Sequence, residues 1–430
     1  MNSRLYELTA GLPIGDTHEH IITSGVLKRH SRGLIELIGE AYLHDDVISA
    51  GAAEEMFSQS LSDEVRWERI KPHLFNTANT SYYRSLVMAL NDLFDMRIAN
   101  IDDGNWRELD ARLKNAACQG EAWYESVLHK KANIRHCMRD KDRVSNTEVE
   151  LWQGKGLKSI QDEEFEPRFF RRVARTDLLL NVVFKAYRPE IERVYGVDIC
   201  ELDDIDALIR AFAVRSEREG AVCYKSVAAY FRSLSFASCV RDSAAASLRA
   251  ILAERDTTED RMRLQDYMIH ALLQEADRRA MPFQFHTGMQ ALNANTVDNA
   301  NPLRLNTLFL RYPNVCFIML HGGYPYAPMA GVLAKKFENV MLDFSWLPQI
   351  GYTAAVHAAS EWFDIVPMNK ITWGGDCRHV ENAYAAVILF RKLMYEVLSA
   401  KVADGMIDND TAARMAERIM YRNAEDIYKL

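Results

Sequence analysis

Short apolar runs alternate with longer amphipathic stretches along the second half of the chain. The runs are AVCYK ending at Lys225, PFQFH ending at His286, VCFIML before His321, NVMLDF ending at Phe344 and KITWGGD ending at Asp376. Apolar runs of this length predict buried strands, and apolar positions spaced three and four apart predict the helices between them. Alternating strands and helices predict a parallel sheet.

The spacing of these runs indicates a barrel. His286 and His321 lie 35 residues apart, close to the roughly 30 residues of one strand-helix-strand unit. His321 and Asp376 lie 55 residues apart, with the NVMLDF run between them. These runs therefore fit strands five to eight of a (β/α)₈ TIM barrel, an α/β fold.

The first half of the chain predicts the remaining strands and a helical insertion. A helix over Arg4 to Leu12 leads into a first strand at PIGDTHEH, and further strands are expected at Ala132 to Met138 and at Leu178 to Phe184. The sequence between the first of these strands and the strand at Ala132 to Met138 is rich in helical periodicity. We expect a catalytic barrel formed by residues 1–24 and 126–430. Residues 25–125 should form a large helical insertion after the first strand that covers the barrel mouth, because such insertions emerge on the active-site face.

The amino-acid composition limits the kinds of molecule that this protein is expected to bind. The 430 residues are 48% hydrophobic and 26% charged, with a net charge of -8. Lysine and arginine are scattered, which argues against nucleic acid or a membrane surface as the partner and favours a small-molecule substrate. No apolar stretch approaches the roughly 20 residues that span a bilayer. With no signal-peptide pattern and seven dispersed cysteines, we expect a cytoplasmic protein with reduced thiols. A homo- or hetero-oligomer stays open.

The first strand carries the first metal-binding pattern. Alternate side chains of a strand share a face, so Asp16, His18 and His20 should point together, and Thr17 and Glu19 away. Two imidazoles one residue apart can chelate one ion, although an isolated HxH arises readily by chance. His286, His321 and Asp376 strengthen the pattern, because all three end later strands, at the barrel face where active sites lie.

Together, the segments DTHEH, QFHTG, MLHGGYP and TWGGD resemble the amidohydrolase superfamily, and in particular its branch of metal-dependent TIM-barrel hydrolases, decarboxylases and uronate isomerase. The resemblance covers roughly residues 12 to 22 and 220 to 390, and the insertion with TANTSYYRSLVMALNDLF is similar to that of uronate-isomerase-like members. It implies that His18, His20, His286 and Asp376 bind a divalent ion. It implies for His321 either a catalytic role beside one ion or a bond to a second.

The residue types themselves suit a divalent ion, with zinc favoured and manganese or iron as alternatives. Asp376, if it contacts both ion and water, could accept the proton of that water. Lys225 shares a strand face with two small residues and should point into the barrel mouth. In relatives a lysine here is carboxylated and bridges two ions, or pairs with a substrate carboxylate.

Other side chains near the predicted mouth could bind substrate. We count Lys225, Arg378, Trp346 and Arg232 as candidates, since a guanidinium there favours a carboxylate-bearing substrate.

Three reactions fit these residues. The first is hydrolysis by a metal-activated water, or the related decarboxylation, on a small substrate that bears a carboxylate. The second is a uronate-isomerase-like aldose–ketose isomerisation. The third is oxygenation at two irons, or iron and manganese, held by a site that includes Lys225, His286 and His321. His321 separates them, because an imidazole with a pKa near neutrality would suit proton transfer beside a single ion.

Overall fold

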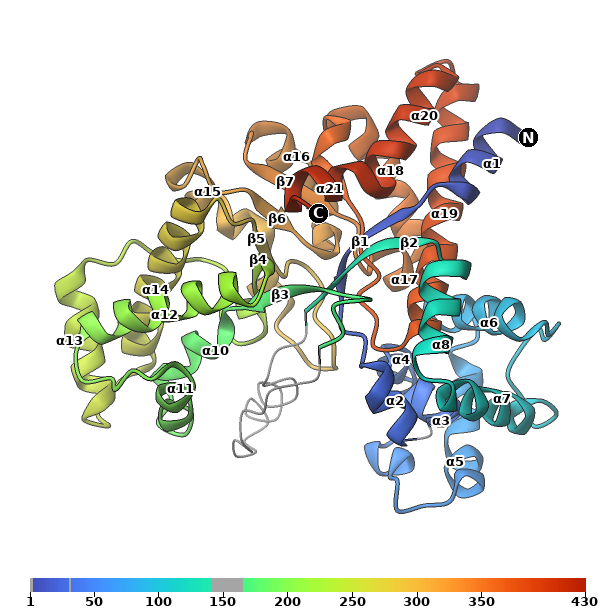
Figure 1. The fold of residues 1–430 in the computed structure, drawn as a ribbon, viewed down its shortest axis with the longest axis horizontal. Helices are drawn as coiled ribbons and strands as arrows, with labels where there is room; N and C mark the ends of the chain where they lie inside the picture. Colours follow the sequence, from blue (N-terminus) through green and yellow to red (C-terminus); the bar gives the residue numbers. More distant parts are fainter. Residues whose placement is uncertain (1–2, 31, 141–164) are drawn as a thin grey trace.

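Eight parallel strands form the centre of the protein. The structure is a computed structural model that describes residues 3–30, 32–140 and 165–430 (Figure 1). The strands pair in chain order from β1 to β8, each parallel to the next. Their bounds are β1 Ile14–Glu19, β2 Ile134–Arg139, β3 Arg171–Arg175, β4 Ala221–Ser226, β5 Phe283–Phe285, β6 Phe317–Met319, β7 Val340–Asp343 and β8 Ile371–Thr372. The predicted TIM barrel is confirmed.

Helices surround this barrel. In the first part of the chain they are α1 Ser3–Gly11, α2 Ser24–His30, α3 Leu34–Gly39, α4 Leu43–Ser49, α5 Asp63–Asn76, α6 Ser81–Phe94, α7 Trp106–Cys118 and α8 Glu121–Tyr124, followed by a π-helix over Glu125–Lys131. In the middle they are α10 Asp177–Leu180, α11 Arg188–Tyr195, α12 Leu202–Arg218, α13 Arg241–Leu252 and α14 Thr258–Arg279. The last are α15 Asn306–Arg311, α16 Ala327–Lys336, α17 Leu347–Ile350, α18 Tyr352–Ile365, α19 Val380–Ala403, α20 Asn409–Glu417 and α21 Asn423–Tyr428. Among the described residues, no helix has the length and apolar character needed to cross a membrane.

One predicted strand is wrong. Leu178 to Phe184 was expected to be the third strand, but Asp177–Leu180 is helix α10 and Asn181–Val183 is a 3₁₀ turn. The third strand is Arg171–Arg175, whose sequence RRVAR has arginines at both ends. A short, fully apolar run does not distinguish a buried strand from a buried helical turn. Here the leucines are buried on every side of α10. The run therefore shows neither the alternation of a half-buried strand nor the periodicity of an amphipathic helix.

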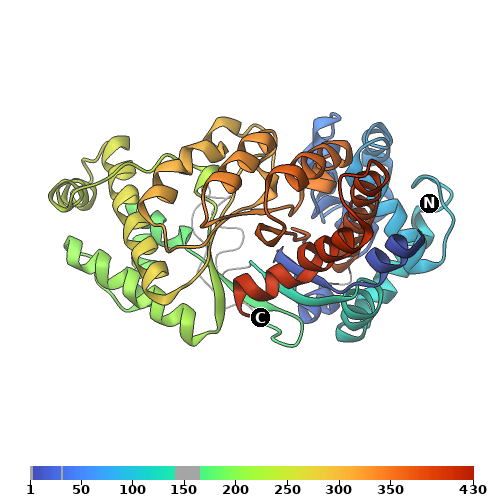
Figure 2. The same ribbon diagram turned by 90° about the horizontal axis from the view of Figure 1, so that it is seen from above.

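The helices α3 to α7 form a body with its own core. Apolar side chains of this segment, among them Leu34, Ile38, Trp67 and Leu90, pack together, and Trp346 of the barrel joins the same cluster. In Figures 1 and 2 these helices lie together beside one side of the barrel, apart from α12 to α15. The contact through Trp346 places the body against the loop that follows β7. The exact division of the chain at residues 25 and 125 remains a prediction.

The barrel closes along a seam between β1 and β8. An isolated parallel bridge joins Asp16 to Trp373. Backbone hydrogen bonds continue the seam beyond both strands: Asp376 N donates to His18 O at 2.7 Å, and His20 N donates to Cys377 O at 2.9 Å. The seam therefore sets the position of the segment TWGGD against the segment THEH.

Two glycines allow the approach of these segments. A Cβ atom on Gly374 would lie 2.7 Å from His18 N, and one on Gly375 would lie 2.0 Å from Glu19 Oε1. Both distances are shorter than a carbon atom can tolerate without displacing its neighbours. The glycine pair before Asp376 is thus explained by close packing across the seam.

We expect Gly374→Ala to destabilise the protein by about 1–3 kcal/mol, the range typical of overpacking a tightly packed site, because β1 and β8 must move apart. Urea unfolding measures this change. Gly11→Ala is the matched control, since a Cβ atom there meets nothing within 4 Å. An equal effect of the two substitutions would show that the seam is not tightly packed.

Candidate metal centre

Three of the predicted ligands converge at the seam. The ligand atoms of His18, His20 and Asp376 all lie within 4.8 Å of one another. His18 and Asp376 are buried, whereas the His20 side chain keeps 22% of its surface exposed. Two imidazoles and one carboxylate at this spacing suit a divalent ion, with room for water or substrate as a further ligand.

Asp376 is the contact point of the cluster. Its Oδ1 lies 3.2 Å from His20 Nε2 and 3.5 Å from His18 Nε2. The same oxygen accepts a hydrogen bond from the Tyr42 hydroxyl at 3.0 Å, while Oδ2 lies 3.4 Å from Nδ1 of His321. One carboxylate therefore contacts groups from β1, from the end of β6 and from the helical insertion.

His286 lies next to His321 rather than within the three-ligand group. The ring centroids of His286 and His321 are 4.2 Å apart. In an eight-stranded barrel β5 lies opposite β1 and next to β6. His286, which follows β5, therefore lies closer to His321, which follows β6, than to the histidines of β1. His286 Nε2 lies 2.9 Å from the Met289 carbonyl. A carbonyl only accepts, so the proton sits on Nε2 and the lone pair of Nδ1 remains for another partner.

A chain of buried hydrogen bonds orients His321. Asp343 accepts a hydrogen bond from the hydroxyl of Ser345, and Ser345 Oγ lies 3.2 Å from His321 Nδ1. With the hydroxyl proton directed to Asp343, Ser345 Oγ accepts the proton of Nδ1. Nε2 of His321 then carries a lone pair, and this buried atom has no hydrogen-bond partner among the described residues. An unsatisfied buried nitrogen beside other ligand groups fits a metal site.

The three fully buried histidines, His18, His286 and His321, are neutral without a metal. Burial lowers the pKa of His18 well below 6.5, and the nearby Lys225 lowers it further. Burial, with His286 and Lys225, likewise lowers the pKa of His321 well below 6.5. The expected near-neutral pKa of His321 is therefore wrong for the metal-free protein. Neutral imidazole is the form that binds metal ions.

Lys225 lies inside the barrel, as its strand position predicted. The side chain is fully buried, with Nζ 3.2 Å from His18 Nε2 and 4.0 Å from Asp140 Oδ2. Burial lowers the pKa of Lys225 to about 8. Near neutral pH most of this amine therefore carries its charge, while a minor fraction is uncharged and able to accept a proton.

Strained backbone gathers at the same place. His321, Trp346 and Asp376 have φ values of 63°, 65° and 56°, in the left-handed region that residues other than glycine seldom occupy. Such strain costs free energy and persists where the surrounding structure holds it, often at functional sites. Its concentration on two candidate ligands and the tryptophan between them supports a built site.

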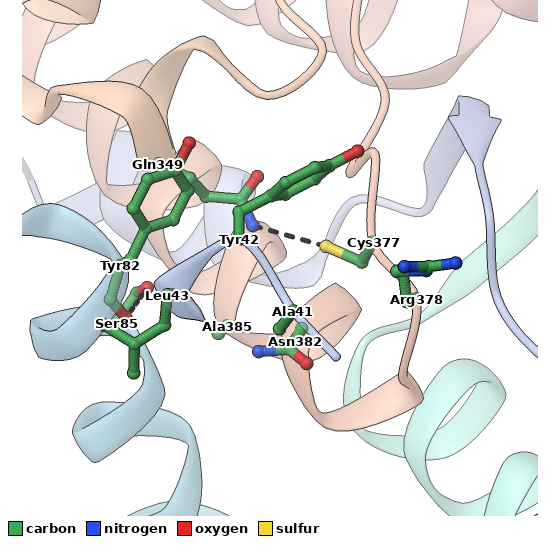
Figure 3. A pocket seen from close by; sticks show the side chains of 10 residues that line it. All are labelled: Ala41, Tyr42, Leu43, Tyr82, Ser85, Gln349, Cys377, Arg378, Asn382 and Ala385. Atoms are coloured by element: carbon green, nitrogen blue, oxygen red, sulfur yellow. Dashed lines mark hydrogen bonds between the residues drawn. The ribbon is translucent and has the colours of Figure 1, made fainter. Parts of the chain in front are cut away.

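A pocket adjoins the cluster, between the insertion and the barrel (Figure 3). Tyr42 and Tyr82 from the insertion, Gln349 from α17, and Cys377 and Arg378 after β8 line it. The Tyr42 ring also packs against Trp346, with centroids 4.4 Å apart. The insertion therefore supplies side chains directly to the site.

Comparisons with known proteins agree with this arrangement. A model of the amidohydrolase family matches residues 235–430. These residues, a little less than half of the chain, are similar to that family. It is 32% identical over 151 residues to protein fluG of Emericella nidulans, a match that covers 35% of this chain and only 17% of that protein. This chain therefore spans only a small part of that protein's length.

Solved structures share the fold over nearly the whole chain. A uronate isomerase from Thermotoga maritima is 16% identical with a TM-score of 0.79, and a glucuronate isomerase from Caulobacter crescentus is 15% identical with a TM-score of 0.75. A protein from Lactobacillus casei ATCC 334, described as a candidate metal-dependent hydrolase, is 17% identical with a TM-score of 0.69. Each covers 99% of this chain, and the chain covers 96%, 93% and 97% of them respectively. At such identities the likeness shows the fold.

Among the proposed substrate-binding residues, Arg232 lies elsewhere. Its guanidinium binds the carboxylate of Asp266 at 2.5 Å and the Met262 carbonyl at 3.1 Å. A buried arginine with these partners holds α14 against the loop after β4, so we leave it out of the site. Trp346 and Arg378 do lie at the barrel mouth, Trp346 buried against His321 and Arg378 half-buried in the pocket.

Sequence reasoning missed three residues of the site. Asp140 directly follows β2 and is fully buried, and Arg175 at the end of β3 donates to it at 3.0 Å. Although burial alone would raise it, Arg175, His20 and Lys225 hold the pKa of Asp140 below its usual value. Asp140 could have been found, because polar residues at the ends of barrel strands lie on the active-site face. Arg175 could not, because the third strand was predicted at the wrong residues. Tyr42 comes from the insertion, where no pattern indicated a contact with Asp376.

The β1 face also differs in one detail. Asp16, expected beside the two histidines, instead forms a hydrogen bond with Glu19, and burial raises the pKa of Asp16 to about 7. The irregular pairing of β1 with β2 between Asp16 and Glu19 explains why strict alternation fails there.

The depressed histidine pKa values predict the pH dependence of stability. The unfolded state has a histidine pKa near 6.5 and the folded state a much lower one, so the unfolded state binds more protons below pH 6.5. The metal-free protein should therefore lose stability as pH falls below about 6.5. Each such histidine contributes about 1.4 kcal/mol per pH unit. Urea unfolding at several pH values gives the slope of the unfolding free energy against pH. His321→Asn should reduce this slope by the contribution of about one proton, and His357→Asn on the exposed face of α18 should leave it unchanged. Identical slopes in all three proteins would contradict the assignment.

Proposed function

We propose that this chain is a metal-dependent hydrolase that acts on a small substrate with a carboxylate group. The observation that supports it most is the convergence on one buried carboxylate, Asp376, of two imidazoles from β1, a third from β6 and a tyrosine hydroxyl. We further propose that His18, His20 and Asp376 hold one ion, with zinc favoured and manganese or iron as alternatives.

The bound ion would supply a Lewis acid and a water molecule of lowered pKa. The side chains supply the remaining functions. Asp376 Oδ2 faces His321, so the carboxylate can accept a proton at that oxygen while Oδ1 faces the two histidines. The Tyr42 hydroxyl keeps its proton, because burial raises its pKa well above 10, and it donates to Oδ1.

Cationic groups beside the ligands favour a carboxylate-bearing substrate. Lys225 and Arg175 both approach Asp140, and Arg378 lines the pocket beyond Asp376. We propose Lys225 and Arg378 as the groups that orient the substrate carboxylate, with Trp346 and Tyr42 closing the mouth above it. Guanidinium groups suit this task because they bind carboxylates in a bidentate manner.

A uronate-isomerase-like reaction is the second candidate. The observation that favours it is the full-length structural likeness to the uronate isomerases of Thermotoga maritima and Caulobacter crescentus. Solvent isotopes distinguish the two. A hydrolase incorporates ¹⁸O from water into the product of an N-acyl amino acid or a lactone. An isomerase given D-glucuronate in ²H₂O forms a ketose with deuterium on carbon.

The role of Asp376 is tested by metal content. Asp376→Asn should weaken binding of the ion by more than about 100-fold, since loss of even an outer-shell partner typically costs 10–100-fold. Elemental analysis of protein purified without chelator measures it, and Asp404→Asn on the surface is the matched control. Normal metal content in Asp376→Asn would remove this residue from the site.

The role of His321 is tested by comparing metal content with turnover. We expect His321→Asn to retain at least one ion per chain and to lose about 100-fold or more in turnover, the scale for a proton-transfer group. Loss of one of two ions would instead support a second metal position formed by His286, His321 and Lys225. If both ions of such a site were redox-active, the oxygenase reaction would be favoured. Unchanged turnover would show that His321 is structural.

A further inference from the structure

A second cavity lies outside the barrel, between α12 and α14. The start of α13 and the end of α15 complete its walls, and its volume is about 260 Å³. These helices lie on the side of the molecule away from α2 to α7 (Figures 1 and 2). None of the residues proposed for the metal centre lines it. The cavity is therefore a separate feature of the surface.

Arginines dominate its lining. Arg210, Arg241, Arg278 and Arg311 face two carboxylates, Asp206 and Glu275. We call this cavity, defined by these six residues, the arginine cleft. Four guanidinium groups on so small a surface are unexpected in a chain of net charge -8. The excess of positive charge makes the cleft attractive to anions.

Two of the arginines are already neutralised. Arg241 pairs with Asp206 at 2.6 Å, and Arg278 pairs with Glu275 at 2.5 Å. The other two have no carboxylate partner within the described residues. Arg311 donates to the neutral hydroxyl of Ser238, and no hydrogen bond or ion pair holds Arg210 among residues 3–30, 32–140 and 165–430. The uncompensated charge therefore belongs to Arg210 and Arg311.

The floor of the cleft adds no negative charge. His270 lies there, buried, with Nε2 3.0 Å from the Ala237 carbonyl and Nδ1 2.9 Å from the Tyr312 hydroxyl. Burial, together with Arg311, lowers the pKa of His270, so the ring is neutral. The cleft therefore combines a neutral, buried side chain with two guanidinium groups that have no carboxylate partner among the described residues, which suits a concave anion site.

We propose that the arginine cleft binds a small ligand with oxyanion groups, either a phosphate ester or a di- or tricarboxylate, through Arg210 and Arg311. Guanidinium groups bind both oxyanions in a bidentate manner. The cavity volume of about 260 Å³ lies just below the roughly 300–1,000 Å³ of drug-sized ligand sites, so the cleft suits a compact ligand. α12 leads directly into β4 with Lys225, and α14 leads into β5 before His286. A ligand that bridges these helices contacts the elements that precede two residues of the metal centre.

Calorimetric titration with inorganic phosphate and, separately, with citrate tests the proposal, with ionic strength held constant by sodium chloride. Both anions also bind metal ions, so the titrations are repeated in Asp376→Asn protein. We expect saturable binding of at least one anion in both backgrounds. Arg210→Gln combined with Arg311→Gln should weaken it at least about tenfold, the loss expected when charge-assisted hydrogen bonds are removed. Arg249→Gln combined with Arg255→Gln, two exposed arginines outside the cleft, is the matched control and should leave binding unchanged.

The two probes identify the ligand chemistry: tighter phosphate binding indicates a phosphate ester, and tighter citrate binding indicates a polycarboxylate. Three results would overturn the proposal. They are the absence of saturable binding, equal binding by both double variants, and binding that disappears in Asp376→Asn protein, which would place the anion at the metal centre. Thermal unfolding of each variant confirms that a loss of binding does not reflect a loss of fold.

Discussion

The closure of the barrel between β1 and β8 is the constraint on which the site depends. Only one bridge, Asp16 to Trp373, joins the two strands, and the seam continues as backbone hydrogen bonds along the loops that carry His18, His20 and Asp376. The hydrogen bond from Asp376 N to His18 O at 2.7 Å fixes the carboxylate beside the imidazoles. Gly374 and Gly375 make the approach possible because no Cβ atom fits there. The same contacts thus complete the fold and assemble the candidate ligands.

Burial gives this cluster its chemical character. The buried histidines His18, His286 and His321 share the barrel interior with Lys225 and several carboxylates, in a place where an unpaired charge is costly. The imidazoles are neutral, and burial brings the pKa of Lys225 to about 8. Neighbouring groups then determine which nitrogen is free in two of the rings: His286 Nε2 donates a hydrogen bond to Met289 O, and His321 Nδ1 donates one to Ser345 Oγ. The metal-free cluster is therefore already in the protonation state that an ion requires.

Much of this arrangement follows from the sequence, because strand ends in a parallel barrel meet on one face. That rule located His18, His20, His321 and Asp376 and placed Lys225 inside. It failed where local pattern is ambiguous or absent. The run LLLNVV is apolar on all sides and was taken for a strand, which hid Arg175, while Tyr42 reaches Asp376 from a separate helical body. Arg232 was included in the site by mistake. Its position after a strand end does not reveal that the carboxylate of Asp266 already binds its guanidinium group.

The central claim is that the seam holds a metal ion, and anomalous X-ray scattering from crystals grown with zinc, manganese or ferrous iron tests it most directly. The account predicts an anomalous peak between His18 Nε2, His20 Nε2 and Asp376 Oδ1, at about 2.0–2.2 Å from each if the ion is zinc. A further peak between His286 and His321 would extend the account to two ions. A peak at the outer surface alone, or none near Asp376 in crystals soaked with each metal, would contradict it.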